Sequence, residues 1–84
     1  MIKQIVDFSR DEAEGGAVTI ELFLLAEDPR THSKILQELA RDGAILQTVD
    51  CDTIKAKYKG VTQDKLLSLL SEGWSFEGKE EEAI

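Results

Sequence analysis

The pattern of hydrophobic and polar residues predicts several strands along the chain. The clearest stretch is residues 54–59 (IKAKYK), in which every second residue is a lysine. A period of two predicts a strand with one face in the core and one face in water. Residues 17–25 and 44–49 also predict strands. Phe23 and Leu25 make the second half of 17–25 apolar on both faces, as expected of a central strand.

A further strand is predicted at Ile2–Phe8, where Ile2, Val6 and Phe8 are expected to share the apolar face. The glycine pair at residues 15–16 can adopt the positive φ angles that a turn requires. We therefore expect this first strand to form an antiparallel hairpin with the strand that follows it.

Two helices are predicted from their capping residues. Asp28 and Pro29 begin the first helix, because the carboxylate accepts unpaired backbone N–H groups and proline has none to lose. Gly43 ends this helix, Thr62 begins the second, and Gly73 ends the second. The residues expected on their apolar faces are Ile35, Leu36, Leu39 and Ala40 in the first helix and Leu66, Leu67, Leu69 and Leu70 in the second.

From residue 17 onward the predicted order is strand, helix, strand, strand, helix and a short strand at 74–76. This is the order of the ferredoxin-like fold, in which the first helix links two parallel strands. We therefore predict an α+β protein: a ferredoxin-like two-layer sandwich with two helices on one face of a mainly antiparallel sheet. The extra N-terminal strand is expected beside residues 17–25, in the place usually taken by the last strand, with 74–76 next to it or across an end.

Length and charge limit the class of protein. The 84 residues fit one domain, predicted over residues 1–77, followed by an acidic disordered tail over residues 78–84. The net charge of −7 disfavours binding to nucleic acid, because the phosphate backbone would be repelled. No apolar run approaches the roughly 20 residues of a membrane span, and the N-terminus lacks a signal-peptide pattern. We therefore expect a soluble, cytoplasmic protein without membrane attachment.

The first helix and its flanks carry a short motif: an Asp-Pro start, spaced aliphatic residues, then a small residue and a glycine before the next strand. Its members are Asp28, Pro29, Ile35, Leu39, Ala40 and Gly43. In these features residues 17–50 resemble the first half of an ACT domain, a small regulatory module of ferredoxin-like fold.

The ACT-like resemblance implies a sensor of a small molecule such as an amino acid or an anion. The implied ligand loop is Asp28, Pro29 and Arg30. Arg30 departs from the family, which has glycine there so that the backbone can approach the ligand. A second departure is Thr31 or His32, which stands where the family has an aliphatic residue.

Lys55, Lys57 and Lys59 place three like charges on one face of a strand. Solvation, a neighbouring acid such as Glu21, or an edge strand protected by lysine would each account for them. The functional alternative is a patch that binds an anion or an acidic partner.

Four further residues have side chains that can contribute to a site: Trp74, Phe76, His32 and Cys51. Trp74 and Phe76 either close the core or, if exposed, form a surface for a partner. His32, the single histidine, is expected at the surface without the orienting partner that a general base needs. Cys51 lies between two aspartates in a spacing that matches no usual metal site.

The sequence carries no glycine-rich phosphate loop, no paired catalytic carboxylates and no nucleophile elbow. It therefore favours a non-enzymatic, acidic interaction or regulatory module that binds a protein partner, with a homodimer as one form of that interaction. No cofactor or metal is expected. The alternative function is the ACT-like sensor of an amino acid or an anion, and an enzyme is the third choice.

Overall fold

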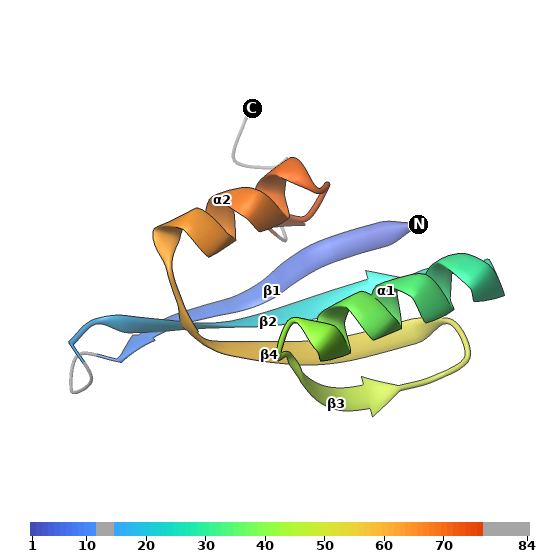
Figure 1. The fold of residues 1–84 in the computed structure, drawn as a ribbon, viewed down its shortest axis with the longest axis horizontal. Helices are drawn as coiled ribbons and strands as arrows, with labels where there is room; N and C mark the ends of the chain where they lie inside the picture. Colours follow the sequence, from blue (N-terminus) through green and yellow to red (C-terminus); the bar gives the residue numbers. More distant parts are fainter. Residues whose placement is uncertain (12–14, 77–84) are drawn as a thin grey trace.

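The computed structural model describes residues 1–11 and 15–76, which form a five-stranded sheet and two helices (Figure 1). The predicted α+β class, with two helices and one mixed sheet, is confirmed. The predicted acidic tail, residues 78–84, lies outside the described residues. In chain order the elements are β1 (Ile2–Asp11), β2 (Ala17–Leu25), α1 (Pro29–Arg41), β3 (Ile45–Val49), β4 (Thr53–Val61), α2 (Gln63–Ser71) and β5 (Ser75–Phe76).

The sheet order is β3-β4-β2-β1-β5. All pairs are antiparallel except β1–β5, which is parallel and joins Gln4 to Ser75 and Ile5 to Phe76. Because β4 lies between β2 and β3, these two strands run in the same direction, as the crossover through α1 predicted. The order differs from the ferredoxin-like one, because β1 occupies the place beside β2 and β5 lies outside β1.

Both helices cover the same side of the sheet, and the core lies between them and the strands (Figure 1). Alternate residues of β2 and β4 point into this layer, where large aliphatic side chains each contribute about 1.5–3 kcal/mol when buried. The least exposed of them are Ile20, Leu22, Leu24, Ile54 and Ala56, none more than 1% exposed. The other buried hydrophobic residues are Ile5, Ala26, Ile35, Leu39, Tyr58, Leu69 and Trp74.

The predicted helix starts are confirmed. The Asp28 carboxylate accepts hydrogen bonds from the Thr31 backbone N–H (3.2 Å) and hydroxyl (2.8 Å), and Pro29 is the first residue of α1. At the start of α2 the Thr62 hydroxyl accepts a bond from the Lys65 N–H (3.1 Å). These caps satisfy backbone donors that have no partner inside the helix.

The buried face of β1 differs from the prediction that placed Ile2, Val6 and Phe8 on it. Ile5 is the buried residue of this strand, whereas Phe8 is 44% exposed. The pairing of β1 with β2 shifts register between Ile5 and Asp7. One extra residue at such a bulge reverses the alternation of side chains between the two faces of a strand, so a strict period of two cannot describe β1.

Helix α2 buries a narrower stripe than predicted. Leu69 is buried and Leu66 partly buried, whereas Leu67 and Leu70 are exposed. Leu67 and Leu70 point about 160° and 100° away from Leu69 around the helix, so the sheet cannot cover all of them.

The surface location expected for His32 is wrong. His32 is buried, and its Nε2 lies 3.4 Å from the carbonyl oxygen of Thr53. His32 stands three residues before Ile35 and seven before Leu39, so it belongs to the stripe of α1 that faces the sheet.

Candidate functional site

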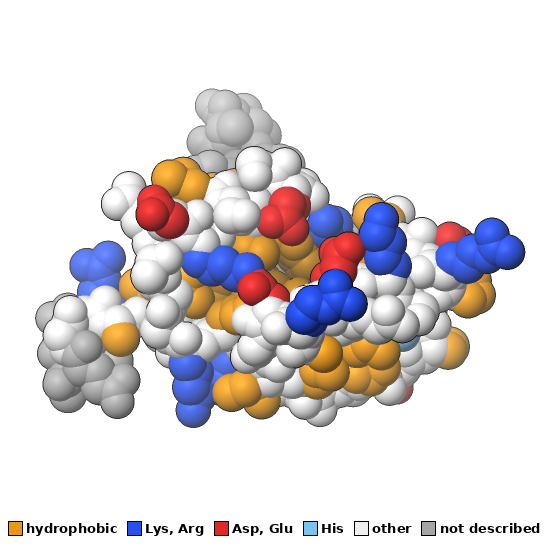
Figure 2. Space-filling view, in the orientation of Figure 1, with side chains coloured by type: hydrophobic (Ala, Val, Ile, Leu, Met, Phe, Trp, Pro, Cys, Tyr) orange, Lys and Arg blue, Asp and Glu red, His pale blue; other side chains and the backbone are white. Residues whose placement is uncertain are grey.

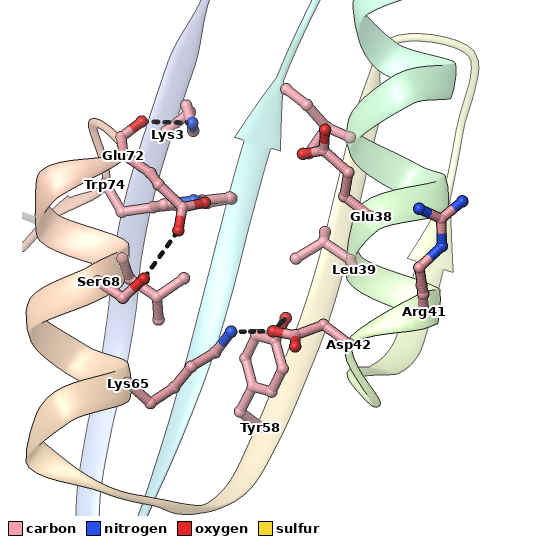
Figure 3. Close-up of a pocket in the computed structure, with 12 residues that line it drawn as sticks. Lys3, Glu38, Leu39, Arg41, Asp42, Tyr58, Lys65, Ser68, Glu72 and Trp74 are labelled. Atoms are coloured by element: carbon pink, nitrogen blue, oxygen red, sulfur yellow. Dashed lines mark hydrogen bonds and ion pairs between the residues drawn. The ribbon is translucent and has the colours of Figure 1, made fainter.

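A groove of about 490 Å³ runs between α1 and α2 (Figure 3). Figure 2 shows this hollow with acidic and basic side chains around its mouth and hydrophobic side chains at its base. The insertion of β1 between β2 and β5 widens the sheet, and two helices do not fill the layer above it. The base of the groove is formed by buried residues from both helices, from β4 and from the segment after α2: Ile35, Leu39, Tyr58, Leu69 and Trp74.

At one end of the groove a polar bridge joins the two helices. Asp42, directly after α1, forms an ion pair with Lys65 of α2 and accepts a 3.0 Å hydrogen bond from the Tyr58 hydroxyl (Figure 3). The Lys65 ammonium also lies 4.9 Å from the centre of the Tyr58 ring. Burial, together with the charge of Glu72, raises the pKa of Tyr58 above its ordinary value near 10, so the phenol stays neutral and its hydroxyl donates a hydrogen bond to Asp42.

At the other end an ammonium group sits on an indole ring. Lys3 Nζ lies 5.1 Å from the centre of the Trp74 ring and donates a 2.7 Å hydrogen bond to the backbone carbonyl of Glu72. The Glu72 carboxylate accepts a 3.0 Å bond from the Ser68 hydroxyl, and Glu38 points from α1 toward the groove (Figure 3). A cation held over an aromatic face is stabilised by the negative charge density of the ring.

Toward the residues that the structure describes, the groove keeps hydrogen-bonding capacity of both kinds, donor and acceptor. An ammonium group has three N–H donors, and Lys3 directs one of them to the Glu72 carbonyl. Within residues 1–11 and 15–76 the Glu38 carboxylate has no hydrogen-bond or ion-pair partner, and the same residues contain no group of three or more potential metal ligands. The groove therefore brings the N–H donors of Lys3 and the carboxylate of Glu38 to one opening.

The structure does not bring the predicted ligand loop together. Asp28 lines a depression of about 320 Å³ with Met1 and Leu25, whereas Pro29 and Arg30 line a different one of about 430 Å³. The bonds that Asp28 accepts from Thr31 lower the pKa of its carboxyl group and direct it to the helix end. The carboxylate therefore acts as the cap of α1.

The predicted lysine patch lies on the side of the sheet that faces away from the helices. Lys55 pairs with Phe23, and Lys57 pairs with Glu21, whose carboxylate is 3.5 Å from the Lys57 ammonium. The neighbouring acid expected at Glu21 is therefore confirmed. The edge-strand explanation for the lysines, Lys59 included, is wrong, because β4 is an interior strand between β3 and β2.

The aromatic residues near the C-terminal end of the described chain do not form an exposed pair. Trp74 is 4% exposed and forms part of the groove base. Phe76 is partly buried and meets Phe8 edge to face, with ring centres 6.2 Å apart. The core interpretation is therefore correct for Trp74, which is not available as an exposed anchor for a partner.

The side of the sheet opposite the helices is called the open face below, because no helix or strand in the described ranges packs on it. An exposed sheet face usually carries polar side chains. Here Phe23 and Leu25 of β2 lie next to Gln4 and Ile2 of β1. The other residues on this face are Asp7, Ser9, Thr19, Glu21, Thr53, Lys55, Lys57, Ile45 and Thr48.

Sequence reasoning placed β2 correctly as a central strand, but it did not predict that one face of the sheet would be uncovered, and it missed the groove. The double-sided apolar pattern of residues 17–25 singled out Phe23 and Leu25. The groove residues Lys3, Lys65 and Glu72 were not singled out, because they come from three distant segments. The one local feature of the sequence that indicated a groove residue was the lysine at position 3, inside a strand predicted from its apolar residues.

Two further observations concern the described part of the chain. Its helices are too short and too polar to cross a membrane. Cys51 is an exposed free thiol. No protein-family model matches the sequence, and comparisons with curated proteins and with solved structures give no match either.

Proposed function

We propose that this chain is a non-enzymatic interaction module that binds a protein partner through its open face. The observation that supports this proposal most is the position of Phe23 and Leu25, which lie at the middle and end of a face with no described layer over it. Large aromatic and aliphatic side chains anchor protein interfaces, because their desolvation supplies most of the binding energy.

The residues around this apolar strip fit the same role. Lys55 and Lys57 lie on one side of it, and Glu21 and Gln4 lie beside it on β2 and β1. An apolar centre with a charged and polar rim is the usual composition of a protein interface. The rim gives orientation and selectivity, and the centre gives affinity.

Charge insertion at Phe23 tests the proposal. Phe23→Glu places a carboxylate at the centre of the open face, and we expect it to abolish binding of any partner that the wild-type chain retains in a pull-down. Leu67→Glu is the matched control, because Leu67 is 55% exposed on α2, on the other side of the molecule. Circular dichroism establishes that both variants are folded. Retention of the same partner by Phe23→Glu would contradict the proposal.

We propose a sensor of an amino acid or an anion as the second candidate function, with the groove as its site. The unused donors of Lys3 and the neighbouring Trp74 ring favour this location. The ligand loop implied by the ACT-like resemblance is less suitable, because Asp28 and Arg30 line different depressions.

Thermal unfolding in the presence of amino acids and small anions tests the sensor. A ligand at about 100 times its dissociation constant stabilises the folded state by about 2.7 kcal/mol, which a melting curve resolves. We expect Lys3→Met to remove that stabilisation and Lys34→Met, a change on the exposed side of α1, to keep it. No shift with any ligand at millimolar concentration would exclude this function.

A further inference from the structure

We infer that the partner bound by the open face is a second copy of this chain, stacked face to face about a two-fold axis that runs parallel to the strands. This inference rests on the proposed function, because it names the partner for the same surface. It depends on the order of charges across the sheet, on the apolar strip beside them and on the area of the face.

The charges on the open face are separated by strand. Residues that lie side by side across the sheet are Ile45 of β3, Lys57 of β4, Glu21 of β2 and Asp7 of β1. Positive charge is therefore carried by β4, which also holds Lys55, and negative charge by the two strands beyond it. At its two central strands, β4 and β2, this order makes the face complementary to a reversed copy of itself.

Only one of the two face-to-face arrangements uses this complementarity. A two-fold axis along the strands, between β4 and β2, places Lys57 of one copy over Glu21 of the other, and does so twice. A two-fold axis across the strands would place β4 over β4 and lysine over lysine, which is unfavourable. Packed sheets are about 10 Å apart, a gap that extended lysine and glutamate side chains can bridge together.

The same arrangement covers the apolar strip. Phe23 and Lys55 are neighbours in the register of β2 and β4, so the axis between these strands places Phe23 of each copy over Lys55 of the other. The aliphatic stem of lysine packs on an aromatic ring, and the ammonium group is attracted to the ring face. Each copy would thus remove the partly exposed phenylalanine of the other from water.

The size of the face sets the strength expected of this dimer. β2 is nine residues long, and β3, β4, β2 and β1 form the width, so the face measures roughly 30 by 19 Å at about 3.3 Å per residue and 4.8 Å per strand. Two copies would bury about 1,100 Å², at the lower limit for a specific interface. With a net charge of −7 on each chain, we expect a weak, concentration-dependent dimer at about 0.15 M salt, where long-range repulsion is screened.

Two single variants and their mixture test the arrangement by sedimentation velocity. Lys57→Glu alone and Glu21→Lys alone place like charges opposite each other, so each should weaken dimerisation by at least about tenfold. An equimolar mixture of the two variants should restore dimerisation, because in the mixed dimer residue 57 of each chain faces an opposite charge at residue 21 of the other chain. The internal Lys57–Glu21 pair is broken in both variants, so only contacts between chains can account for the restoration.

Lys34→Glu, a charge reversal on the exposed side of α1, is the control and should dimerise like the wild type. A wild-type chain that stays monomeric up to about 1 mM overturns the inference, and so does a mixture that stays monomeric. A third outcome is a monomeric wild type that binds a different protein, together with a Phe23→Glu variant that does not bind it. In that case the proposed function stands and the second copy is excluded as the partner.

Discussion

The two faces of the sheet are built from the same strands but have different environments. On the covered face, Leu22 and Leu24 of β2 lie under the helices and are almost completely buried. On the open face, Phe23 and Leu25 of the same strand are only partly buried. Both sets are equally apolar in sequence. The comparison teaches that the position of the helices, and not the hydrophobicity of a strand, decides which residues form the core.

The largest effect expected from this comparison concerns neighbouring residues of β2. Leu22→Ala should lower the free energy of unfolding by about 2–5 kcal/mol, because it leaves a cavity in the core. Phe23→Ala should cost about 1 kcal/mol. Urea unfolding at low micromolar concentration, where we expect the chain to be monomeric, measures both. Equal costs would mean that the open face is buried within one chain and that the two faces do not differ.

A smaller effect is expected at Tyr58, which brings a polar group to the covered face. Tyr58→Phe removes the hydrogen bond to Asp42 and should cost about 1 kcal/mol at pH 7. The pKa of Tyr58 is raised in the folded state. The neutral phenol therefore contributes fully to the stability of the fold below pH 10, and this contribution is lost as the pH rises through the raised pKa.

The pH dependence separates the phenol from the rest of the core. Unfolding curves of the wild type should show that the free energy of unfolding falls between pH 9 and the alkaline limit of folding. The fall should be smaller in Tyr58→Phe, which has no phenol to ionise. Parallel pH profiles for the two proteins would show that the Tyr58 pKa is the same in the folded and unfolded chains.

The smallest effect is expected at Lys57 on the open face. Its ion pair with Glu21 has an N–O distance of 3.5 Å, and both side chains are about one-third exposed. Such a pair contributes about 0–1 kcal/mol. Lys57→Ala should therefore change the stability of the monomer by less than about 0.5 kcal/mol in urea unfolding at low concentration. A loss above about 1.5 kcal/mol would show that something covers this face.

The parts of the fold that local patterns determine were predictable. β4 alternates as residues 54–59 indicated, with Ile54, Ala56 and Tyr58 buried. The caps at Asp28 and Thr62 also appear where predicted, because a cap needs only a side chain and a backbone a few residues away.

The place of β1 beside β2, with residues 74–76 next to it, was predicted correctly. Other parts that depend on several segments were not predictable. The bulge near Val6 changes which residues of β1 face the core, and no residue in the sequence marks it. The groove depends on the distance between α1 and α2, which the insertion of β1 sets. Lys3, Lys65 and Glu72 therefore meet as a consequence of topology and not of a motif.

The position of β1 also has a consequence for the folding kinetics of the chain. The β1–β2 hairpin is a local structure, because its strands are close in sequence, and hairpins form in about 1–10 µs. The parallel pairing of Gln4 with Ser75 instead closes a loop of 71 residues, the difference between these two positions. Loop closure of this length carries a larger entropic cost, so we expect the β1–β5 contact to form last and to open first in hydrogen exchange.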